Sequence, residues 1–294
     1  MAGLLERVGR GETVLSDGGL GTQLIERGLE PGQCPEALVL ERPEVLAEIG
    51  SLYLDAGAEI LTTNTFGGSP LKLKHYSLDG QTEEINRRAV EILREIAKGR
   101  ACVAASVGPC GAILEPYGEA AESEVYESFE RQLRALQAAG PDVILVETMT
   151  DLREATLAVT AAKRVACELP VVATMTFDPT PRGHFTIMGV NVEQAASGLA
   201  EAGADVVGSN CGNGIEEMVE IARAFRRCTR LPIAIQANAG LPENRAGQVV
   251  YPETPEFMAS RLPELVELGV AVIGGCCGTT PDHIRTMKDV LARR

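Results

Sequence analysis

The chain has 294 residues, 45% of them hydrophobic, which is enough to bury one large core or two small ones. Its formal net charge of −14 argues against a nucleic-acid partner, because phosphate binding needs a basic surface. No apolar run reaches the roughly 20 residues of a membrane span, and the first residues are too polar for a secretory signal, so a cytoplasmic protein without a membrane partner is expected.

Short apolar runs recur along the chain, each followed by a turn rich in Gly, Asn, Asp or Thr and then by a longer amphipathic stretch. The runs are almost continuously apolar rather than alternating, which is typical of strands buried on both faces of a parallel sheet. The predicted strands are residues 13–16, 60–63, 102–106, 143–146, 171–176, 206–209, 233–236 and 271–274.

Helices are predicted between these strands. Residues 83–98 and 124–138 each place apolar side chains on one stripe, with charged side chains opposite, and residues 215–225 are a further helix. Eight strand–helix units predict an α/β fold, a (β/α)8 TIM barrel that forms a single domain over residues 1–294. A doubly wound open sheet is the alternative, but no Gly-x-Gly-x-x-Gly turn follows the first strand.

Three of the eight cysteines follow predicted strands at one end of this barrel. Cys211 follows the sixth strand, and Cys276 and Cys277 follow the eighth. In a barrel the chemistry lies at the carboxyl ends of the strands, and the tips of strands six and eight flank that of strand seven. Three thiolates with one open position is the arrangement of a reactive zinc site, so the spacing predicts bound Zn²⁺.

Other interpretations of these cysteines stay open. Cys276 and Cys277 can form a buried pair or a vicinal disulfide. A cysteine nucleophile is a third interpretation, which is weaker because none of the three histidines occupies an obviously paired position. His283, just beyond the two adjacent cysteines, is interpreted as a surface residue at a helix start. The remaining five cysteines are interpreted as small buried hydrophobic residues.

Motifs at successive strand tips resemble those of the zinc-dependent homocysteine methyltransferases. The resemblance spans nearly the whole chain and is carried by Asp17-Gly18-Gly19, Thr63-Asn64-Thr65-Phe66, Glu147, Asn210-Cys211-Gly212 and Gly274-Gly275-Cys276-Cys277-Gly278. The stretches that begin at Asn210, Gln236 and Cys277 look most like the homocysteine-binding domain of cobalamin-dependent methionine synthase. The resemblance implies that homocysteine is the substrate and methionine the product.

The resemblance leaves the methyl donor open. It favours methylcobalamin carried by a corrinoid protein or domain, although no Asp-x-His-x-x-Gly corrinoid motif occurs in this sequence. The chain is therefore expected to be either an excised module or a standalone protein that meets its corrinoid on another chain. A small donor (S-methylmethionine, S-adenosylmethionine or betaine) is the alternative, and a zinc-binding scaffold or thiol sensor is the alternative outside the enzymes.

Roles for the remaining site residues follow from their positions and from the resemblance. Glu147 is expected to bind the substrate ammonium, or else to pair with an arginine. The backbone N–H groups of the turn at Asp17, Gly18 and Gly19 are expected to take the substrate carboxylate, unless this is a plain turn. Thr63 and Ser106 are expected to offer hydroxyl contacts. The resemblance implies Asn238, or a water, as the fourth zinc ligand without substrate.

Two longer segments, residues 178–190 and 241–255, also follow predicted strands and are expected to overhang the same end of the barrel. Their Gly, Pro and Asn content suits either mobile covers or a docking surface for the protein that carries the methyl donor.

Overall fold

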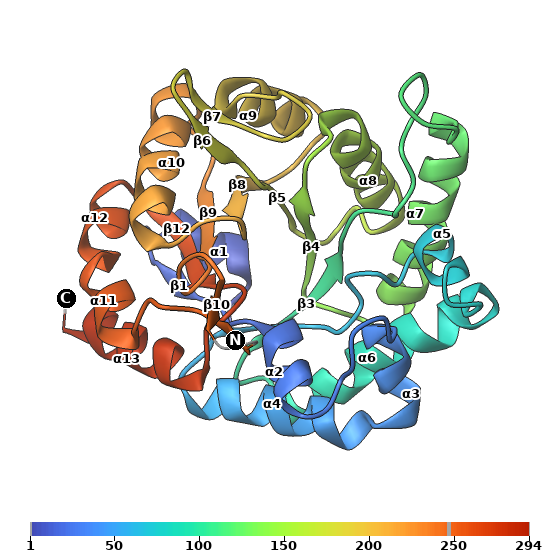
Figure 1. The fold of residues 1–294 in the computed structure, drawn as a ribbon, viewed down its shortest axis with the longest axis horizontal. Coiled ribbons are helices and arrows are strands. Elements are labelled where there is room, and N and C mark those ends of the chain that lie inside the picture. The colour runs from blue at the N-terminus through green and yellow to red at the C-terminus, as the bar shows by residue number, and fades with distance from the viewer. Residues whose placement is uncertain (1, 246–247, 294) are drawn as a thin grey trace.

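Eight parallel strands form a ring that is surrounded by helices (Figure 1). The computed structural model describes residues 2–245 and 248–293. All eight predicted strands are present, and their ends differ from the predicted ones by at most three residues. The strands are β1 (Val14–Leu15), β2 (Ile60–Thr62), β3 (Cys102–Val107), β4 (Val143–Met149), β5 (Val171–Met175), β8 (Val206–Asn210), β9 (Ile233–Ala237) and β12 (Val270–Gly275).

The order of the strands confirms the TIM barrel. Neighbours in space run β1–β12–β9–β8–β5–β4–β3–β2, and each adjacent pair is parallel. A parallel bridge between Ser16 and Ile60 joins β1 to β2 and closes the ring. All carboxyl ends of the strands therefore lie at one end of the barrel, which is where residues 206–211 and 270–277 can meet.

Most helices lie outside the ring, and the predicted helices 83–98, 124–138 and 215–225 are confirmed as α6, α7 and α10. The helices are α1 (Leu4–Gly9), α2 (Leu20–Glu26), α3 (Leu38–Glu41), α4 (Pro43–Asp55), α5 (Pro70–Lys74), α6 (Thr82–Ala97), α7 (Glu122–Ala138), α8 (Leu152–Val165), α9 (Val192–Glu201), α10 (Ile215–Cys228), α11 (Pro255–Ser260), α12 (Leu262–Glu267) and α13 (Pro281–Ala292), with short 3-10 turns at Pro35–Ala37 and Asp79–Gln81. No helix in the described parts of the chain has the length and apolarity that crossing a membrane requires.

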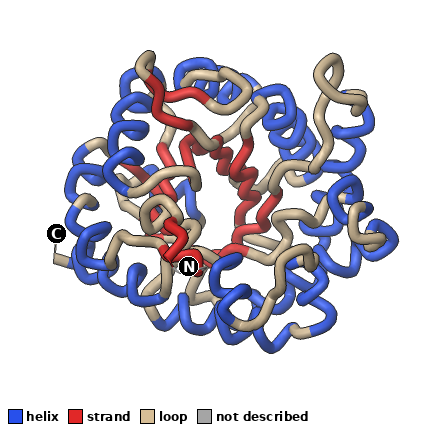
Figure 2. The backbone as a smooth tube through the Cα atoms, in the orientation of Figure 1, coloured by secondary structure: helices blue, strands red, loops and turns tan. Residues whose placement is uncertain are grey.

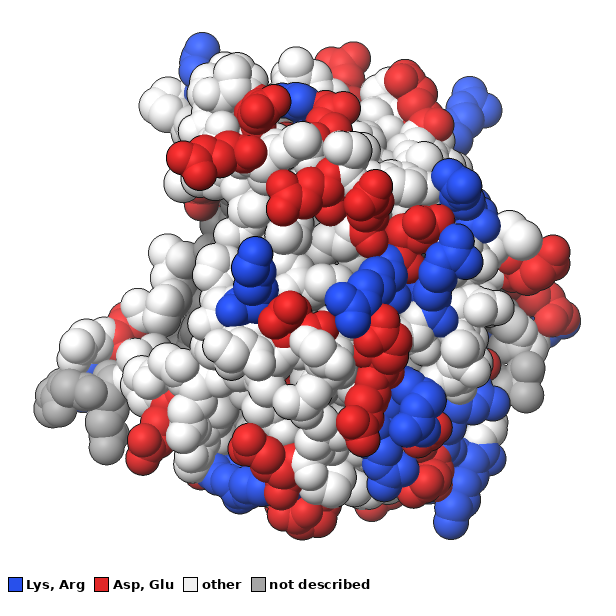
Figure 3. All heavy atoms as spheres, turned by 90° about the vertical axis from the view of Figure 1, so that its right-hand side faces the viewer, with Lys and Arg blue, Asp and Glu red and all other residues white. Residues whose placement is uncertain are grey.

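Acidic and basic side chains are interspersed on the outer face of the helices shown in Figure 3. Arg131 of α7 pairs with Glu83 of α6, and Arg153 of α8 pairs with Glu122 of α7. These pairs are exposed, so each contributes at most about 1 kcal/mol. The outer layer is therefore held mainly by its apolar stripes.

Two long loops carry structure that the sequence did not predict. Residues 178–190 contain the antiparallel hairpin of β6 (Asp178–Thr180) and β7 (Gly183–Phe185), and residues 241–255 contain that of β10 (Glu243–Arg245) and β11 (Gln248–Val250). Figure 2 shows the β6–β7 hairpin as short strands outside the ring. β6 and β10 are exposed along their length, so they lack the apolar run by which a buried strand is recognised.

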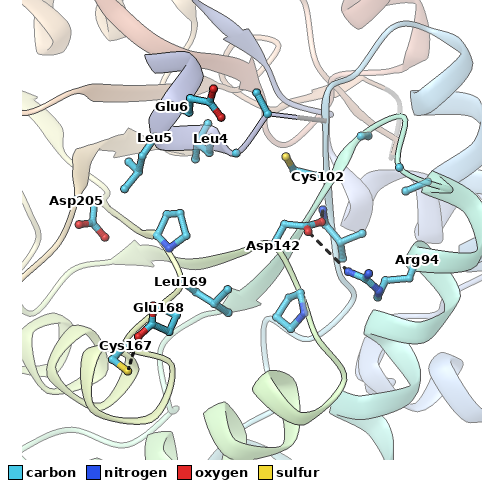
Figure 4. A pocket seen from close by; sticks show the side chains of 18 of the residues that line it. Leu4, Leu5, Glu6, Arg94, Cys102, Asp142, Cys167, Glu168, Leu169 and Asp205 are labelled. Carbon is cyan, nitrogen blue, oxygen red and sulfur yellow. Dashed lines mark hydrogen bonds and ion pairs between the residues drawn. The ribbon is translucent and has the colours of Figure 1, made fainter. Parts of the chain in front are cut away.

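The barrel interior is filled by small and branched side chains, and Leu4 of α1 covers its amino end. Leu4 is only 2% exposed and belongs to the same apolar cluster as Val14, Ile60 and Val206. Beside α1 lies a cavity of about 540 Å³, bordered by the starts of β3 and β4 and by the segment leading into β5 (Figure 4). Two of its four carboxylates serve the fold, since Asp142 accepts from the Val103 N–H and Asp205 from the Val171 N–H.

The position of Leu4 gives a stability prediction. Leu4→Ala should lower the free energy of unfolding by about 2–5 kcal/mol, because a buried leucine is lost and a cavity remains. The neighbouring Leu5 is 39% exposed, so Leu5→Ala should change the free energy of unfolding by less than about 1 kcal/mol. Urea unfolding of both variants measures the difference, and equal effects would contradict a covering role for Leu4.

Candidate active site

Three cysteine sulfur atoms meet at the carboxyl end of the barrel. Cys211 follows β8, Cys276 and Cys277 follow β12, and the three sulfurs lie within 4.8 Å of one another. The Sγ atoms of Cys211 and Cys277 are 3.8 Å apart. In the described residues no other group of three or more His, Cys, Asp or Glu side chains has metal-binding geometry.

Left-handed backbone and close packing both shape the turns that carry the cysteines. Cys211 has φ of 60°, and Gly212 and Gly278 both have φ of 79°. At Gly274 and Gly275 the requirement is space: an added Cβ would lie 2.7 Å from the Ser16 Cβ and 2.2 Å from the Thr279 Oγ1, respectively. Gly274 therefore lets β12 approach the end of β1, and Gly275 lets it approach the turn that follows β12.

A cavity of about 280 Å³ opens beside the sulfur atoms, and all the predicted substrate-binding residues line it. Leu24, Pro35 and Phe66 form part of its apolar wall. Among the described lining residues there is no Lys, Arg or His. The lining residues predicted from the sequence are Asp17, Gly18, Gly19, Thr63, Ser106, Glu147, Cys211, Cys276 and Cys277.

Glu147 presents a carboxylate to this cavity without a cationic partner. Its Oε1 accepts from the Ser106 hydroxyl at 2.5 Å, and its Oε2 accepts from the Asn210 amide at 3.3 Å. No ion pair joins Glu147 to an arginine of the described chain. The alternative interpretation, in which Glu147 pairs with an arginine, is therefore not supported by the described residues. Burial raises the pKa of Glu147 to about 7, although the Ser106 hydrogen bond opposes the shift. The carboxylate is thus poised to gain from a cation placed in the cavity.

Asp17 is buried and engaged with its neighbours. Its carboxylate accepts from the backbone N–H and the hydroxyl of Thr62, at 2.6 and 2.8 Å, and from the Ser16 hydroxyl. Burial nevertheless raises the pKa of Asp17 to about 6. The adjoining Gly19 N–H, expected to face the substrate carboxylate, donates to the Thr279 hydroxyl at 2.9 Å.

The hydroxyls of Thr63 and Ser106 also have protein partners. Thr63 shares a hydrogen bond of 2.6 Å with the Thr65 hydroxyl and accepts from the Ser106 N–H. Since Ser106 donates to Glu147, both hydroxyls shape the wall and hold the carboxylate in place.

Asn238 lies just beyond β9 and is not among the residues that line the cavity. The N–H of the following residue, Ala239, donates to the Cys277 carbonyl, and the N–H of Asn238 donates to the Asn213 carbonyl. Asn238 is 4% exposed, and its Oδ1 accepts no hydrogen bond from the described residues. A buried amide oxygen without a partner is costly, which points to a ligand at this position.

Hydrogen bonds among the three thiol groups favour one thiolate, so the cluster carries a single negative charge most readily. Hydrogen bonds with Cys211 and Cys276 lower the pKa of Cys277, whereas hydrogen bonds with Cys211 and Cys277 raise the pKa of Cys276. The Tyr251 hydroxyl, at the end of the loop 241–255, also hydrogen-bonds to Cys277. A second thiolate in so small a space needs a cation, because two like charges cannot both be stabilised there.

The histidines lie away from this cavity. His283 is 6% exposed, so its interpretation as a surface residue was wrong. It stands at the start of α13, where its ring accepts from the N–H of the capping residue Thr280 and contacts the Glu253 carbonyl. His184 pairs with Glu217. The chain thus offers no His partner for a cysteine nucleophile among the described lining residues.

No role was predicted for Thr148 or for Asn210, although Asn210 belongs to one of the motifs that carry the resemblance. The pairing of β4 with β5 shifts between Val146 and Met149, and Thr148 within that bulge has φ of 58°. A threonine in this region costs on the order of 1–3 kcal/mol. Asn210 offsets the strain: its Oδ1 accepts from the Thr148 N–H and its Nδ2 donates to the Thr148 hydroxyl, both at 2.7 Å. The only sequence signal was the place of Asn210 beside Cys211.

Comparisons with known proteins agree with this architecture. The sequence profile of the homocysteine S-methyltransferase family matches residues 14–291. Methionine synthase from Mycobacterium leprae is 32% identical over 99% of the chain, and that from Mycobacterium tuberculosis is 32% identical over 95%. The chain spans about a quarter of the length of both, 25% and 24%.

A solved structure has the same fold. The metallated form of the homocysteine methyltransferase MmuM from Escherichia coli superposes with a TM-score of 0.81, covers 99% of each chain and is 23% identical. Its oxidized form gives a TM-score of 0.80 at 22% identity.

The raised pKa of Glu147 predicts a pH-dependent gain in stability for Glu147→Gln in chelator-treated protein. The unfolded chain loses this proton near pH 4.5 and the folded protein only near pH 7, so the group makes wild-type stability fall as pH rises through that window. Gln has no proton to lose. Between pH 5 and pH 8 the variant should therefore gain on the order of 2 kcal/mol over wild type. Urea unfolding at both pH values measures it, and a difference independent of pH would contradict the raised pKa.

Proposed function

This chain belongs to the homocysteine S-methyltransferase family, and we propose that it transfers a methyl group to the sulfur of homocysteine to form methionine. In this reaction a bond forms between the substrate sulfur and the methyl carbon, while the bond from that carbon to the donor breaks. The observation that carries the proposal is the cavity in which three cysteine sulfurs and an unpaired carboxylate, Glu147, face the same space.

The donor set fits zinc. Thiolate sulfurs held about 2.3 Å from a tetrahedral zinc ion lie about 3.8 Å apart, and the Cys211 and Cys277 sulfurs are separated by 3.8 Å. We assign Cys211, Cys276 and Cys277 as the zinc ligands. The unpartnered Oδ1 of Asn238 supports this residue as the fourth ligand when substrate is absent. Bound zinc would keep a coordinated thiol deprotonated at neutral pH, which makes its sulfur nucleophilic.

The chain's own residues bind and orient the amino-acid part of the substrate. Glu147 accepts the ammonium, and the Ser106 hydroxyl holds its carboxylate in position at 2.5 Å. The apolar side chains of Leu24, Pro35 and Phe66 exclude water from one side of the cavity. Charge neutralisation supports this role, because an ammonium would give the buried carboxylate the cation it lacks.

We favour a methyl-corrinoid protein or domain as the methyl donor. The resemblance of the motifs to cobalamin-dependent methionine synthase supports this choice. The two long loops at the carboxyl end of the barrel also expose apolar side chains, with Ile187, Leu241 and Val249 each at least 60% exposed. Exposed apolar residues at the mouth of a site favour a protein partner.

The zinc assignment predicts the result of removing one thiol. Cys277→Ala should reduce bound zinc from about one ion per chain to nearly none and should lower methionine formation by more than about 100-fold, since even indirect contacts to a metal are worth about 10- to 100-fold. Cys228→Ala is the matched control and should keep both. The interpretation of Cys228 and Cys167 as buried was wrong, since both are exposed and Cys228 lies at the end of α10. Metal analysis and product assays measure them. Wild-type protein without zinc, purified in the absence of chelator, would overturn the assignment.

The donor is tested by supplying candidates singly. With homocysteine present, methylcobalamin should support methionine formation, and S-methylmethionine, S-adenosylmethionine or betaine should not. Turnover with one of these small donors and none with methylcobalamin would replace the corrinoid proposal. Zinc binding with no affinity for homocysteine would instead favour a metal-binding scaffold.

A further inference from the structure

The bulge in β4 directs two consecutive side chains toward the same cavity. In a regular strand, neighbouring residues point to opposite faces of the sheet. Glu147 and Thr148 are adjacent in sequence, yet both line the cavity beside the cysteines. The register shift between Val146 and Met149 and the left-handed backbone of Thr148 account for this, since a bulge redirects a side chain.

Thr148 is held in this conformation from the neighbouring part of the barrel. The Asn210 side chain makes two hydrogen bonds of 2.7 Å to it, one with its N–H and one with its hydroxyl. The Asn210 Oδ1 also accepts from the Thr174 hydroxyl, which fixes the orientation of the amide. The amide NH₂ must therefore face Thr148, so the Thr148 hydroxyl is the acceptor in that contact.

The Thr148 hydroxyl can therefore still donate its own proton in a hydrogen bond. Within residues 2–245 and 248–293 no acceptor for this proton is found. The other cavity hydroxyls are committed: that of Thr62 to Asp17, that of Thr63 to Thr65 and that of Ser106 to Glu147. In the neighbouring turn, the N–H groups of Asp17 and Gly19 donate to the Ile60 carbonyl and the Thr279 hydroxyl, whereas no acceptor for the Gly18 N–H is found among the described residues. Thr148 is therefore a donor with an open direction, next to the acceptor Glu147.

We propose that the Thr148 hydroxyl donates a hydrogen bond to the carboxylate of the thiol substrate, while Glu147 binds the ammonium on the same carbon atom. This inference rests on the proposed function and names the group that selects an α-amino acid among thiols. Because the described lining residues include no Lys, Arg or His, a substrate carboxylate has to be bound by neutral donors. Glu147 and Thr148 are adjacent in the bulge, just as the ammonium and the carboxylate are attached to one carbon atom of an amino acid.

The test compares two thiols in two variants. Homocysteine carries both charged groups, and 3-aminopropane-1-thiol is the same molecule without the carboxylate. Thr148→Val should raise the KM for homocysteine by about 10- to 100-fold, the effect of one hydrogen bond to a charged group, with kcat largely kept. The KM for 3-aminopropane-1-thiol should stay within about twofold, because that substrate never makes the contact. Thr148→Ser keeps the hydroxyl and should restore homocysteine binding.

Controls separate the possible failures. Thr156→Val on α8 removes a half-buried hydroxyl that bonds to the Arg153 carbonyl and is not part of the cavity lining, so this variant should behave as wild type. If Thr148→Val does not fold, Thr148→Ala gives the same comparison with less strain in the left-handed region. Equal changes for both thiols, or no change for either, would overturn the role of Thr148. Calorimetry that detects no binding of homocysteine to zinc-loaded wild type would overturn the proposed function itself, and the inference with it.

Discussion

The barrel is closed by a strand of only two residues, and Asp17 completes the closure. Its N–H donates to the Ile60 carbonyl, its carbonyl accepts from the Gly275 N–H, and its carboxylate accepts from the Thr62 N–H. One residue thus links β1 with both β2 and β12. Because Cys276 follows Gly275 directly, the position of Cys276 and Cys277 depends on these hydrogen bonds of Asp17. Asp17 was expected to belong to a substrate-binding turn, and the structure gives its polar groups a role in closing the ring.

The site is built with an excess of negative and neutral groups. Glu147, Asp17 and three thiols surround a cavity whose described lining contains no basic side chain. Burial raises the pKa of both carboxyl groups, and the thiols together favour one charge. Without cations the protein therefore keeps protons in the site that bound cations would displace. A metal ion beside the thiols and an ammonium beside Glu147 are complementary to this arrangement, so each ligand supplies charge that the chain does not.

The sequence predicted the barrel and the gathering of the cysteines because both follow from local patterns. Strands buried on both faces must be continuously apolar, and in a barrel their carboxyl ends share one end, so the positions of Cys211 and Cys276 after such runs imply their meeting. The bulge at Thr148 left no such signal, since it depends on an amide 62 residues away. The exposed hairpins of the two long loops were missed because they need no apolar run. The need for glycine at position 275 could not be predicted either, because it comes from the close approach of Thr279 in the folded barrel.

The last strand of the barrel carries two of the three sulfur atoms. β12 ends at Gly275, and only α13 follows it in the described chain. During synthesis Cys211 therefore leaves the ribosome well before its partners, and the trio is complete only when β12 has paired with both β9 and β1. A metal ion that uses all three sulfur atoms, as the proposed zinc ion would, can therefore be held only after the last strand of the barrel has joined the ring.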